Sequence, residues 1–486
     1  MSRRGLSSIH IVGLVETAVR ESETRIRSAL YNCGYRLPPG RITVSLAPAD
    51  MPKGGSGFDL AIALALLAGA EYFSVDALRE HLVVGELSLE GELRPVRGAL
   101  SYALCERRAG SGSLIMPESL AAQAAAVPGV KAMGARHLPR VVEFLRGEAD
   151  LELPGPRSAT AGAGSSVDLS DVRGQELARR ALEIAAAGGH NLLAIGPPGT
   201  GKSMLATRLP TILPELTLEE SLETSAVWSV AGLLEPGSAL LTRRPLRAPH
   251  HTASDAGVVG GGVPPRPGEL SLAHNGVLLL DELPEFRRSV LEALRQPLEQ
   301  GTVVIARALH RITFPARVQL VGTMNPCPCG MLGERRGALC TCSPEMVKHY
   351  RGRVSGPLLD RIDLHVEVPS VPLDELEASP VGESSSVVRE RVLAARRLQE
   401  ERYAGLGIRC NADVPSSALR DVCQLDQRTI DLVTRASERL CLSARGYDRL
   451  RKVARTIADL EGRSKIVATD VSEALSYRVL DRGAAS

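Results

Sequence analysis

The feature that most constrains this chain is the octapeptide Gly196-Pro197-Pro198-Gly199-Thr200-Gly201-Lys202-Ser203, a full match to the pattern G-x-x-x-x-G-K-S. A short, largely apolar run at 191–195 precedes it, and residues 204–209, which can open a helix, follow it. This strand–loop–helix context is the one in which the pattern forms a phosphate-binding loop. The sequence therefore predicts a nucleotide site within an α/β fold built on a parallel sheet.

The residue types of this loop suit ATP and Mg²⁺. Glycines let the backbone curl so that several N–H groups converge on phosphate oxygens, and the start of the following helix adds partial positive charge. Lys202 is expected to reach the β and γ phosphates, and the Ser203 hydroxyl is expected to bind Mg²⁺. All eight residues of the loop are therefore candidate ATP-binding residues.

A second nucleotide motif lies downstream, in the run 277–282. Its four apolar residues predict a buried parallel strand, and Asp281 and Glu282 follow at the strand's carboxyl end. We expect Asp281 to hold the Mg²⁺ shell and Glu282 to orient and polarise the attacking water. Another apolar strand, 318–324, ends at Asn325, which is expected to touch the γ-phosphate or that water.

Length and charge bound the remaining interpretation. A chain of 486 residues is expected to hold two to four domains. A net charge of +2 gives no information about an acidic partner, so a nucleic-acid site would have to be a local patch. Aromatic residues make up only 3%, which disfavours a surface that grips bases mainly by stacking. No apolar run is long enough to span a bilayer and no signal-peptide pattern opens the chain. The expectation is therefore a cytoplasmic protein with no membrane contact.

Residues 1–146 are predicted to form a mixed α/β domain. The stretches "LAPADMPKGGSGFDLAIALALLA" and "GELSLEGELRPVRG" resemble the proteolytic domain of Lon-type proteases. In that resemblance the nucleophilic serine corresponds to Gly57, next to Ser56, and the general-base lysine corresponds to Leu100. A Ser–Lys dyad needs both side chains within hydrogen-bond reach. The prediction is a protease-like fold that lacks the dyad. The expected elements include strands at 9–12, 41–46 and 113–116, a strand pair at 82–89, and helices at 16–32 and 58–67.

The rest of the chain divides by composition. Residues 147–167 are rich in Gly, Ala, Ser and Pro, which is typical of a linker. The ATPase core is expected over 168–370. An all-helical lid is expected over 380–486, with a long charged helix at 385–403 and a basic helix headed by Arg445.

Two basic segments interrupt the core. The first carries His250 and His251 in a Gly- and Pro-rich stretch. A metal site is the alternative there, but the favoured interpretation is a mobile, basic loop because no helical i, i+4 spacing is present. The second, 302–317, alternates as a β-hairpin with Arg307, His310 and Arg311 near its tip.

Four cysteines follow the second of these segments. Two C-x-C pairs, Cys327/Cys329 and Cys340/Cys342, have the ligand count and compactness of a tetrahedral thiolate Zn²⁺ site. The alternative is four reduced, partly buried thiols. We favour zinc.

The motifs "GPPGTGKS", "RPLRAPHH", "NGVLLLDEL", "GTMNPCPCG" and "SGPLLDRIDLH", in this order, resemble the ComM/YifB-type, magnesium-chelatase-like AAA+ ATPases over essentially the whole chain. The resemblance implies a Lon-like domain, an AAA+ module, a helical lid and a hexameric ring. It also implies a motor that branch-migrates DNA, single-stranded or branched, in recombination during natural transformation. Members usually carry further residues before "IHIVGLVETAV", so the first strands of the Lon-like sheet are expected to be missing.

The resemblance also implies roles for particular residues. Arg361, in "LLDRID", matches the arginine finger that acts on the neighbouring subunit's nucleotide. Arg445 matches the lid arginine that reaches the γ-phosphate of its own subunit. The hairpin carrying Arg307 and Arg311 matches a pore element that contacts DNA.

Two other functions remain open at this point. One is a chelatase motor that drives a metal into a tetrapyrrole, because the AAA+ core resembles that subunit too; the Lon-like amino terminus, which chelatase subunits are expected to lack, weighs against it. The other is an ATP-dependent protease, which Gly57 and Leu100 oppose. Stimulation of ATPase activity by DNA, or by a porphyrin with partner subunits, would separate the first two.

Overall fold

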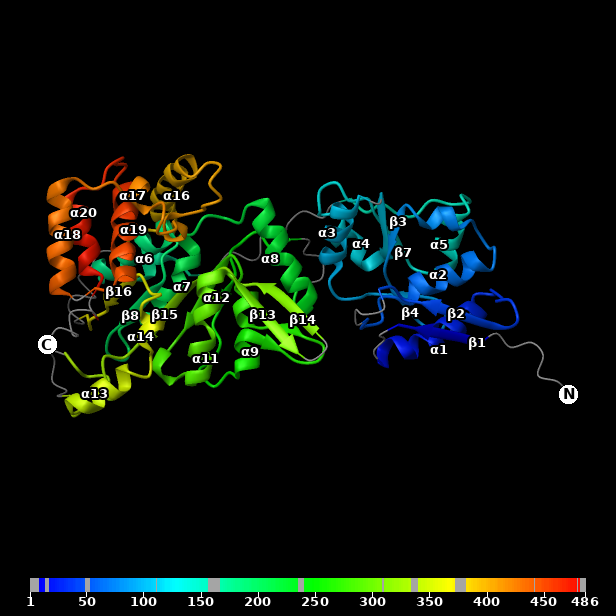
Figure 1. Cartoon of the computed structure of the whole chain (residues 1–486), viewed down its shortest axis with the longest axis horizontal. Helices are drawn as coiled ribbons and strands as arrows, with labels where there is room; N and C mark the ends of the chain where they lie inside the picture. Colours follow the sequence, from blue (N-terminus) through cyan, green and yellow to red (C-terminus); the bar gives the residue numbers. More distant parts are fainter. Residues whose placement is uncertain are drawn as a thin grey trace.

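The computed structural model describes residues 8–13, 17–48, 53–110, 112–155, 167–234, 240–307, 310–333, 340–371, 382–440, 442–478 and 480. It shows a mixed α/β amino-terminal unit, a parallel α/β core and a helical carboxyl-terminal domain (Figure 1). The amino-terminal unit lies at one end of the elongated molecule, and the last helices cover the core at the other end.

The amino-terminal unit is built on short sheets. Two strands, β1 (Ser8–Val12) and β2 (Arg41–Ser45), pair in parallel. A second parallel sheet has the order β3 (His81–Val83), β6 (Ser113–Pro117), β7 (Ala132–Ala135). The expected strand pair at 82–89 is wrong: β3 pairs with β6, while β4 (Glu86–Leu87) forms its own hairpin with β5 (Leu93–Arg94). The helices are α1 (Thr17–Asn32), α2 (Asp59–Gly69), α3 (Ala99–Ala109), α4 (Glu118–Ala124) and α5 (Leu138–Leu145).

Helix α2 is the centre of this unit's core. Its sequence is apolar on nearly every face, as expected of a helix that is enclosed by its neighbours. Its one charged residue, Asp59, is fully buried and pairs with Arg25 of α1 at 2.8 Å. A buried carboxylate needs such a partner, so this pair fixes α1 against α2. Leu151 also packs into this core, beyond residue 147 where the linker is expected to start.

The core is a five-stranded parallel sheet in the order β16-β8-β15-β12-β9. The strands are β8 (Leu192–Ile195), β9 (Leu246–Arg247), β12 (Gly276–Leu280), β15 (Val318–Met324) and β16 (Leu364–Glu367). Successive residues of a strand point to opposite faces. In β12, Val277 and Leu279 belong to one hydrophobic cluster while Leu278 and Leu280 belong to another. Both faces are therefore covered, which explains the unbroken apolar runs in the sequence.

Helices cover the two faces differently. The face of Val277 packs against α6 (Glu176–Gly188), α7 (Lys202–Ile212) and the carboxyl-terminal helices. The opposite face carries α9 (Asp255–Val259), α10 (Glu269–Leu272), α11 (Arg288–Ala293) and α12 (Arg295–Gln300), the hairpin β13 (Thr302–Arg307) with β14 (His310–Pro315), and α13 (Pro344–Arg351) and α14 (Gly356–Leu359).

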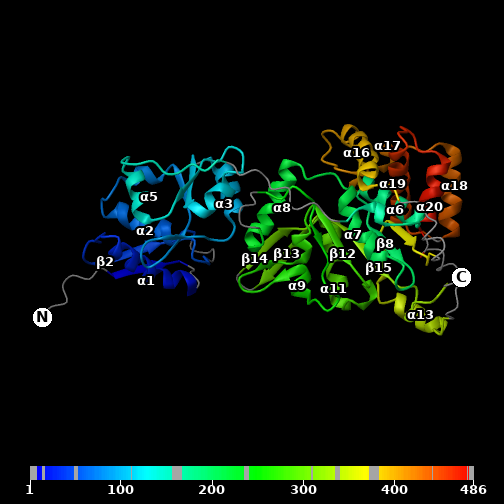
Figure 2. The ribbon, with the colours of Figure 1, turned by 180° about the vertical axis from the view of Figure 1, so that it is seen from behind.

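Helix α8 (Leu218–Ala231) joins the core to the amino-terminal unit. It packs against α3, and Leu222 of α8 enters the apolar cluster of the amino-terminal unit. Arg107 of α3 also pairs with Glu219 of α8 at 3.4 Å. In Figure 2 this helix lies between the two units. Side-chain packing, in addition to the connecting chain, therefore holds the units together.

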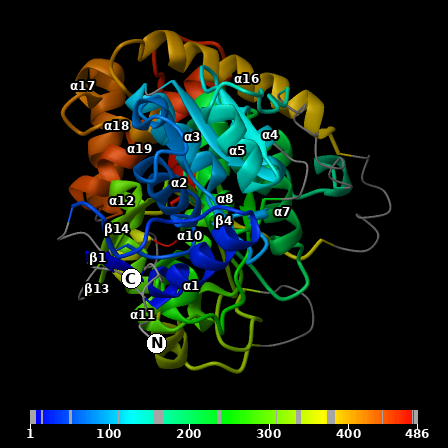
Figure 3. The same ribbon diagram turned by 90° about the vertical axis from the view of Figure 1, so that its right-hand side faces the viewer.

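The helical domain consists of α16 (Ser385–Arg402), α17 (Leu419–Val422), α18 (Gln427–Arg439), α19 (Ala444–Leu460) and α20 (Ala468–Ser476). Figure 3, viewed along the long axis, shows α16 along the upper edge of the molecule and α17, α18 and α19 at its upper left. Arg180 of α6 anchors this domain through Glu461 and Glu473, both at 2.9 Å. Among the described residues, no helix combines the length and apolar character that crossing a bilayer demands.

Candidate functional site

The predicted phosphate-binding loop connects β8 to α7. Gly199 and Gly201 have φ values of +77° and +86°, a region that side chains disfavour. Gly196 needs the absence of a side chain for another reason, since a Cβ there would lie 2.1 Å from the Val368 carbonyl oxygen. The loop therefore has the tight backbone that the motif predicts.

Lys202 points back into this loop. Its ammonium group donates to the carbonyl oxygens of Gly196 at 2.8 Å and Pro197 at 2.6 Å, and to Asn325 Oδ1 at 3.3 Å. Burial lowers the pKa of Lys202, while Asp281 and Glu282 act in the opposite direction. Two backbone carbonyl oxygens bind the Lys202 ammonium group, and the phosphate oxygens of a bound nucleotide would replace these carbonyl oxygens. Asn325 is also within hydrogen-bond distance of the ammonium group.

Asp281 follows β12 and faces α7. Ser203 Oγ lies 2.8 Å from Asp281 Oδ2, and the Thr323 hydroxyl bonds to the other carboxylate oxygen. A hydroxyl and a carboxylate at this distance are hard oxygen ligands of the kind Mg²⁺ prefers. Ser203 and Asp281 thus fit the group that the sequence predicts for them.

Glu282 has an unusual backbone. Its φ and ψ are 54° and 51°, in the left-handed region, and its N–H donates to Thr323 Oγ1 at 3.0 Å. Such strain in a non-glycine residue persists only where surrounding contacts enforce it, and it concentrates at functional sites. The Glu282 side chain is 56% exposed and is free to approach a bound nucleotide. Thr323 holds both acidic residues and was missed in the sequence; a polar residue in an apolar strand was the available signal.

His251 is a second residue whose position beside Glu282 the sequence did not predict. Its Nδ1 lies 3.7 Å from Glu282 Oε2, and its ring lies 4.1 Å from that of His250. The expected loop is only partly irregular, because residues after His251 form α9 and a small hairpin, β10 (Gly260–Gly261) with β11 (Arg266–Pro267). The chain order offered a signal for this contact. The two histidines follow β9 and Glu282 follows β12, so both lie at the carboxyl ends of neighbouring parallel strands.

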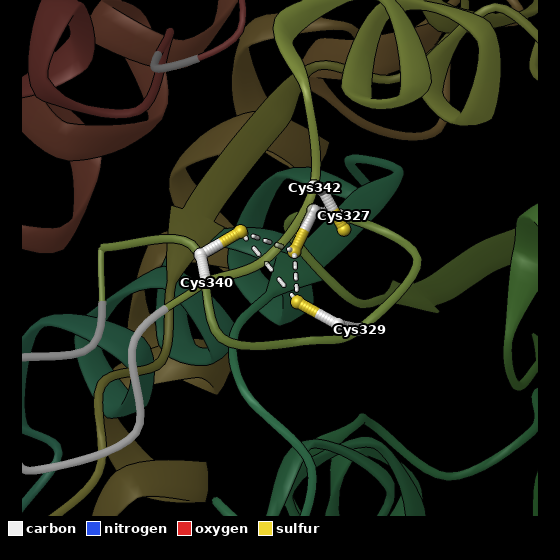
Figure 4. A group of neighbouring side chains, drawn as sticks. All are labelled: Cys327, Cys329, Cys340 and Cys342. Atoms are coloured by element: carbon white, nitrogen blue, oxygen red, sulfur yellow. Dashed lines mark hydrogen bonds between the residues drawn. The ribbon is translucent and has the colours of Figure 1, made fainter.

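The four predicted zinc ligands converge. The ligand atoms of Cys327, Cys329, Cys340 and Cys342 all lie within 4.8 Å of one another. Three of the S···S distances are 3.4, 3.5 and 3.7 Å (Figure 4). Tetrahedral Zn–S bonds of about 2.3 Å separate sulfurs by about 3.8 Å, so the cluster fits a zinc ion. This loop also touches the phosphate-binding loop, since a Cβ on Gly330 would lie 2.6 Å from Pro198 Cδ.

Arg361 lies at the amino ends of the strands, opposite the phosphate-binding loop. It precedes β16, and its carbonyl accepts a hydrogen bond from Asn191 Nδ2, just before β8, at 2.8 Å. The phosphate-binding loop leaves the opposite end of β8, about 13 Å away for a four-residue strand. The guanidinium of Arg361 bonds to the Pro357 carbonyl at 2.7 Å and to Glu299 of α12. Arg361 therefore faces away from the nucleotide site of its own chain.

Arg445 lies beside Arg361, which conflicts with the cis role implied by the resemblance. Its Nη2 is 3.8 Å from Glu299 Oε1, the carboxylate that also binds Arg361. Arg449, one turn along α19, lies 3.3 Å from Asp363. Burial alone would raise the pKa of Asp363, but its hydrogen bond with His190 and the charges of His190 and Arg449 lower it to about 2. The reason for the conflict is that α19 packs at the amino ends of the strands, whereas the phosphate-binding loop of the same chain lies at their carboxyl ends.

The predicted hairpin forms, with β13 and β14 in antiparallel register. Arg311 is exposed, whereas the side chains of Arg307 and His310 lie outside the described part of the structure. The smaller β10–β11 hairpin packs against β13, since a Cβ on Gly260 would lie 2.8 Å from Ile305 Cδ1. Its connecting residue Val263 is 83% exposed. The two hairpins therefore pack together and form one surface, called here the paired-hairpin surface.

The Lon-type positions carry no described dyad. Leu100 is fully buried in an apolar cluster, and a Cβ on Gly57 would lie 3.2 Å from Tyr102 Oη. The neighbouring Ser56 donates to the Glu86 carboxylate. A serine bound to a carboxylate is not paired with the amine base that a Ser–Lys dyad requires.

Comparison with known proteins agrees with this architecture. Residues 168–376 match the family model "Magnesium chelatase, subunit ChlI", residues 1–119 match "Subunit ChlI of Mg-chelatase", and residues 382–478 match the carboxyl-terminal model of that subunit. The chain is 46% identical to YifB of Escherichia coli over 480 residues, which covers 99% of this chain and 93% of that protein.

Two further relatives bear on function. The competence protein ComM of Haemophilus influenzae is 45% identical over 483 residues, covering 98% of this chain and 93% of that protein. The magnesium-chelatase 67 kDa subunit of Chlorobaculum parvum is 30% identical over 197 residues, covering 38% of this chain and 28% of that protein. From its motifs, its sheet order and these matches, the chain belongs to the YifB/ComM family of magnesium-chelatase-like AAA+ ATPases.

Proposed function

We propose that this protein is an ATP-hydrolysing ring motor, a hexamer, that acts on DNA as a branch-migration or helicase activity in recombination during natural transformation. The observation that carries the DNA assignment is the paired-hairpin surface, with exposed Arg266 and Arg311, built on a P-loop core. Near-full-length similarity to a protein named for competence supports the same assignment.

The chain's own residues divide the hydrolytic work. Lys202 and the N–H groups of the loop neutralise the β and γ phosphates. Ser203 and Asp281 would hold Mg²⁺, which would supply positive charge that screens the phosphates. Glu282 orients the attacking water, with His251 beside its carboxylate, and Asn325 contacts the γ-phosphate. The short distances among Lys202, Ser203, Asp281 and Asn325 support this division.

The site is completed by a second subunit. Arg361 and Arg445 lie at the amino edge of the sheet, away from the chain's own Lys202, yet together they form one cationic face. In a head-to-tail ring that face meets the next subunit's nucleotide. We propose that both arginines act in trans, which revises the cis role for Arg445.

The chelatase motor is the second candidate, and the family matches favour it by name. The amino-terminal segment itself matches a chelatase-subunit model, so that segment does not separate the two functions. We expect forked or four-way DNA to raise the ATPase rate and to be unwound or migrated. Stimulation by a porphyrin with its partner subunits, and none by DNA, would instead establish the chelatase function.

Replacing Arg307 and Arg311 together by alanine is expected to weaken DNA binding and flatten its salt dependence. Removing one arginine–phosphate pair should reduce the slope of log affinity against log salt by roughly one unit. Titration of labelled DNA at several salt concentrations measures this slope. Arg435→Ala, an exposed arginine on α18, is the matched control. An unchanged slope would move the DNA site elsewhere, with the segment 247–266 as the next candidate.

We further propose that the cysteine cluster binds one structural Zn²⁺ per chain. Four thiolates close a tetrahedral site with no open position for water. The site would brace the loop that carries Gly330 against Pro198 and begins two residues after Asn325. Metal binding contributes directly to folding where packing is sparse.

The zinc prediction is tested by Cys327→Ser combined with Cys340→Ser. The wild-type protein should contain one equivalent of zinc by elemental analysis, and the variant should contain none. We expect the variant to bind ATP more weakly, because its P-loop loses support. Cys105→Ser, which changes an exposed cysteine of α3, is the control. Metal-free wild-type protein prepared under reducing conditions, with ATPase unaffected by the double change, would leave four ordinary thiols.

A further inference from the structure

Glu299 stands out because it contacts both arginines that face away from their own nucleotide. It accepts a hydrogen bond from Arg361 Nη2, and its Oε1 lies 3.8 Å from Arg445 Nη2. The Arg361 hydrogen bond lowers the pKa of Glu299, and the charges of Arg361, Arg445 and Arg449 act in the same direction. Glu299 is therefore a carboxylate anion between two guanidinium groups.

The two arginines come from different parts of the chain. Arg361 lies between α14 and β16 in the core, whereas Arg445 lies in the first turn of α19 in the helical domain. Both guanidinium groups lie beside the same carboxylate, so their like charges repel each other. Glu299 offsets the repulsion and gives the core and the helical domain one shared contact. Because the side chains of Glu299 and Arg445 are 56% and 59% exposed, their ion pair contributes little to stability. The main effect of Glu299 is on the positions of the two guanidinium groups.

The two arginines differ in how strongly their side chains are restrained by the surrounding residues. The Arg361 side chain is 11% exposed and is held by Pro357 as well as by Glu299, whereas Arg445 is 59% exposed. A guanidinium has five N–H donors, so both residues keep donors for an incoming phosphate. Orientation of these donors sets how well they meet the charge that develops in the transition state.

We propose that Glu299 is a positioning residue that aligns Arg361 and Arg445 toward the nucleotide of the adjacent subunit. This inference rests on the proposed trans site and adds to it the residue that organises its cationic face. In this role Glu299 acts through the two arginines that it contacts.

The position of Glu299 also relates it to the hairpin surface. It lies on the last turn of α12, and Gly301 follows with a φ of +67°. Gly301 closes the base of the β13–β14 hairpin through a 2.8 Å hydrogen bond from Ala316. Glu299 is therefore tied by a short, bonded junction to the element proposed to contact DNA.

Glu299→Gln keeps the size of the side chain and removes its charge. We expect kcat for ATP to fall by roughly 10- to 100-fold, since small misplacement of catalytic groups has effects of this size. The KM for ATP should stay close to wild type because the chain's own loop is untouched. Glu400→Gln, the same change at an exposed position of α16, should leave both parameters unchanged.

Mixing variants tests whether Glu299 serves the neighbour. Glu299→Gln chains mixed with Lys202→Ala chains should be more active than either alone. On the order of a quarter of random interfaces then join an intact loop to an intact cationic face. Glu299→Gln mixed with Arg361→Ala should show no gain, because both variants damage the same face.

The outcomes separate this inference from the function on which it rests. Unchanged kcat in Glu299→Gln, or no gain with Lys202→Ala while Arg361→Ala with Lys202→Ala does gain, would overturn the role of Glu299 alone. Failure of the Arg361→Ala and Lys202→Ala mixture would overturn the trans site, and this inference with it. A mainly structural role for Glu299 would lower kcat and the thermal unfolding midpoint together, without any gain on mixing.

Discussion

Arg361→Ala is expected to leave ATP binding intact and to remove most of the hydrolysis. An arginine finger supplied in trans contributes roughly 10³–10⁵ in rate, and Arg361 lies at the opposite end of β8 from its own P-loop. Nucleotide affinity can be measured by titration with a fluorescent ATP analogue, and turnover by phosphate release.

Mixed oligomers make this prediction specific. Arg361→Ala chains retain a working loop, and Lys202→Ala chains retain a working finger. Mixing them should restore part of the activity, because some interfaces then combine the two intact halves. No gain on mixing, with oligomer formation confirmed by light scattering, would argue for a cis role or none.

Substitutions of Lys202 or Glu282, at the carboxyl ends of the strands, should have equally large effects on ATP hydrolysis. Lys202→Ala removes the buried cation of the loop, which we expect to contact the β and γ phosphates, and should abolish nucleotide binding or turnover. Glu282→Gln should keep binding but trap ATP, because the amide cannot polarise the attacking water.

These two variants are distinguished by measuring bound nucleotide and phosphate release in parallel. Lys202→Ala should lose nucleotide binding or phosphate release. Glu282→Gln should keep the bound nucleotide and lose phosphate release. Normal hydrolysis in either variant would remove that residue from the site. Glu285→Gln, three residues beyond Glu282 and paired with Arg353 at 3.0 Å, is a suitable control for the carboxylate change.

The nucleotide side of the candidate site was predictable because its signals are local. Lys202 and Ser203 lie in a contiguous motif, and Asp281 and Asn325 each end an apolar strand. Parallel strands bring such ends to one edge of a sheet, so sequence order alone predicted their convergence. The four cysteines were predictable for the same reason, since their spacing limits how far apart they can lie.

What escaped prediction depends on contacts between distant segments. Thr323 of β15 and His251, four residues after β9, approach Glu282 from other parts of the chain. Both lie in motifs quoted for the family resemblance, "GTMNPCPCG" and "RPLRAPHH", but neither motif indicates that its residue contacts Glu282. The placement of Arg445 depends on how α19 docks against the core, and Glu299 is informative only once Arg361 and Arg445 are seen beside it. The supposed strand pair at 82–89 failed similarly, because register between short strands is set by neighbours far along the chain.

The separation of Lys202 from Arg361 across the sheet has a consequence for how the enzyme responds to its own abundance. If hydrolysis needs one edge from each of two chains, the rate per chain is set by the fraction of chains that have a neighbour. Specific activity should then rise with protein concentration until rings are complete, and dilution should switch the enzyme off without any inhibitor. Under that condition, expression level would act as a threshold for ATP consumption, and scarce, unassembled chains would consume little ATP.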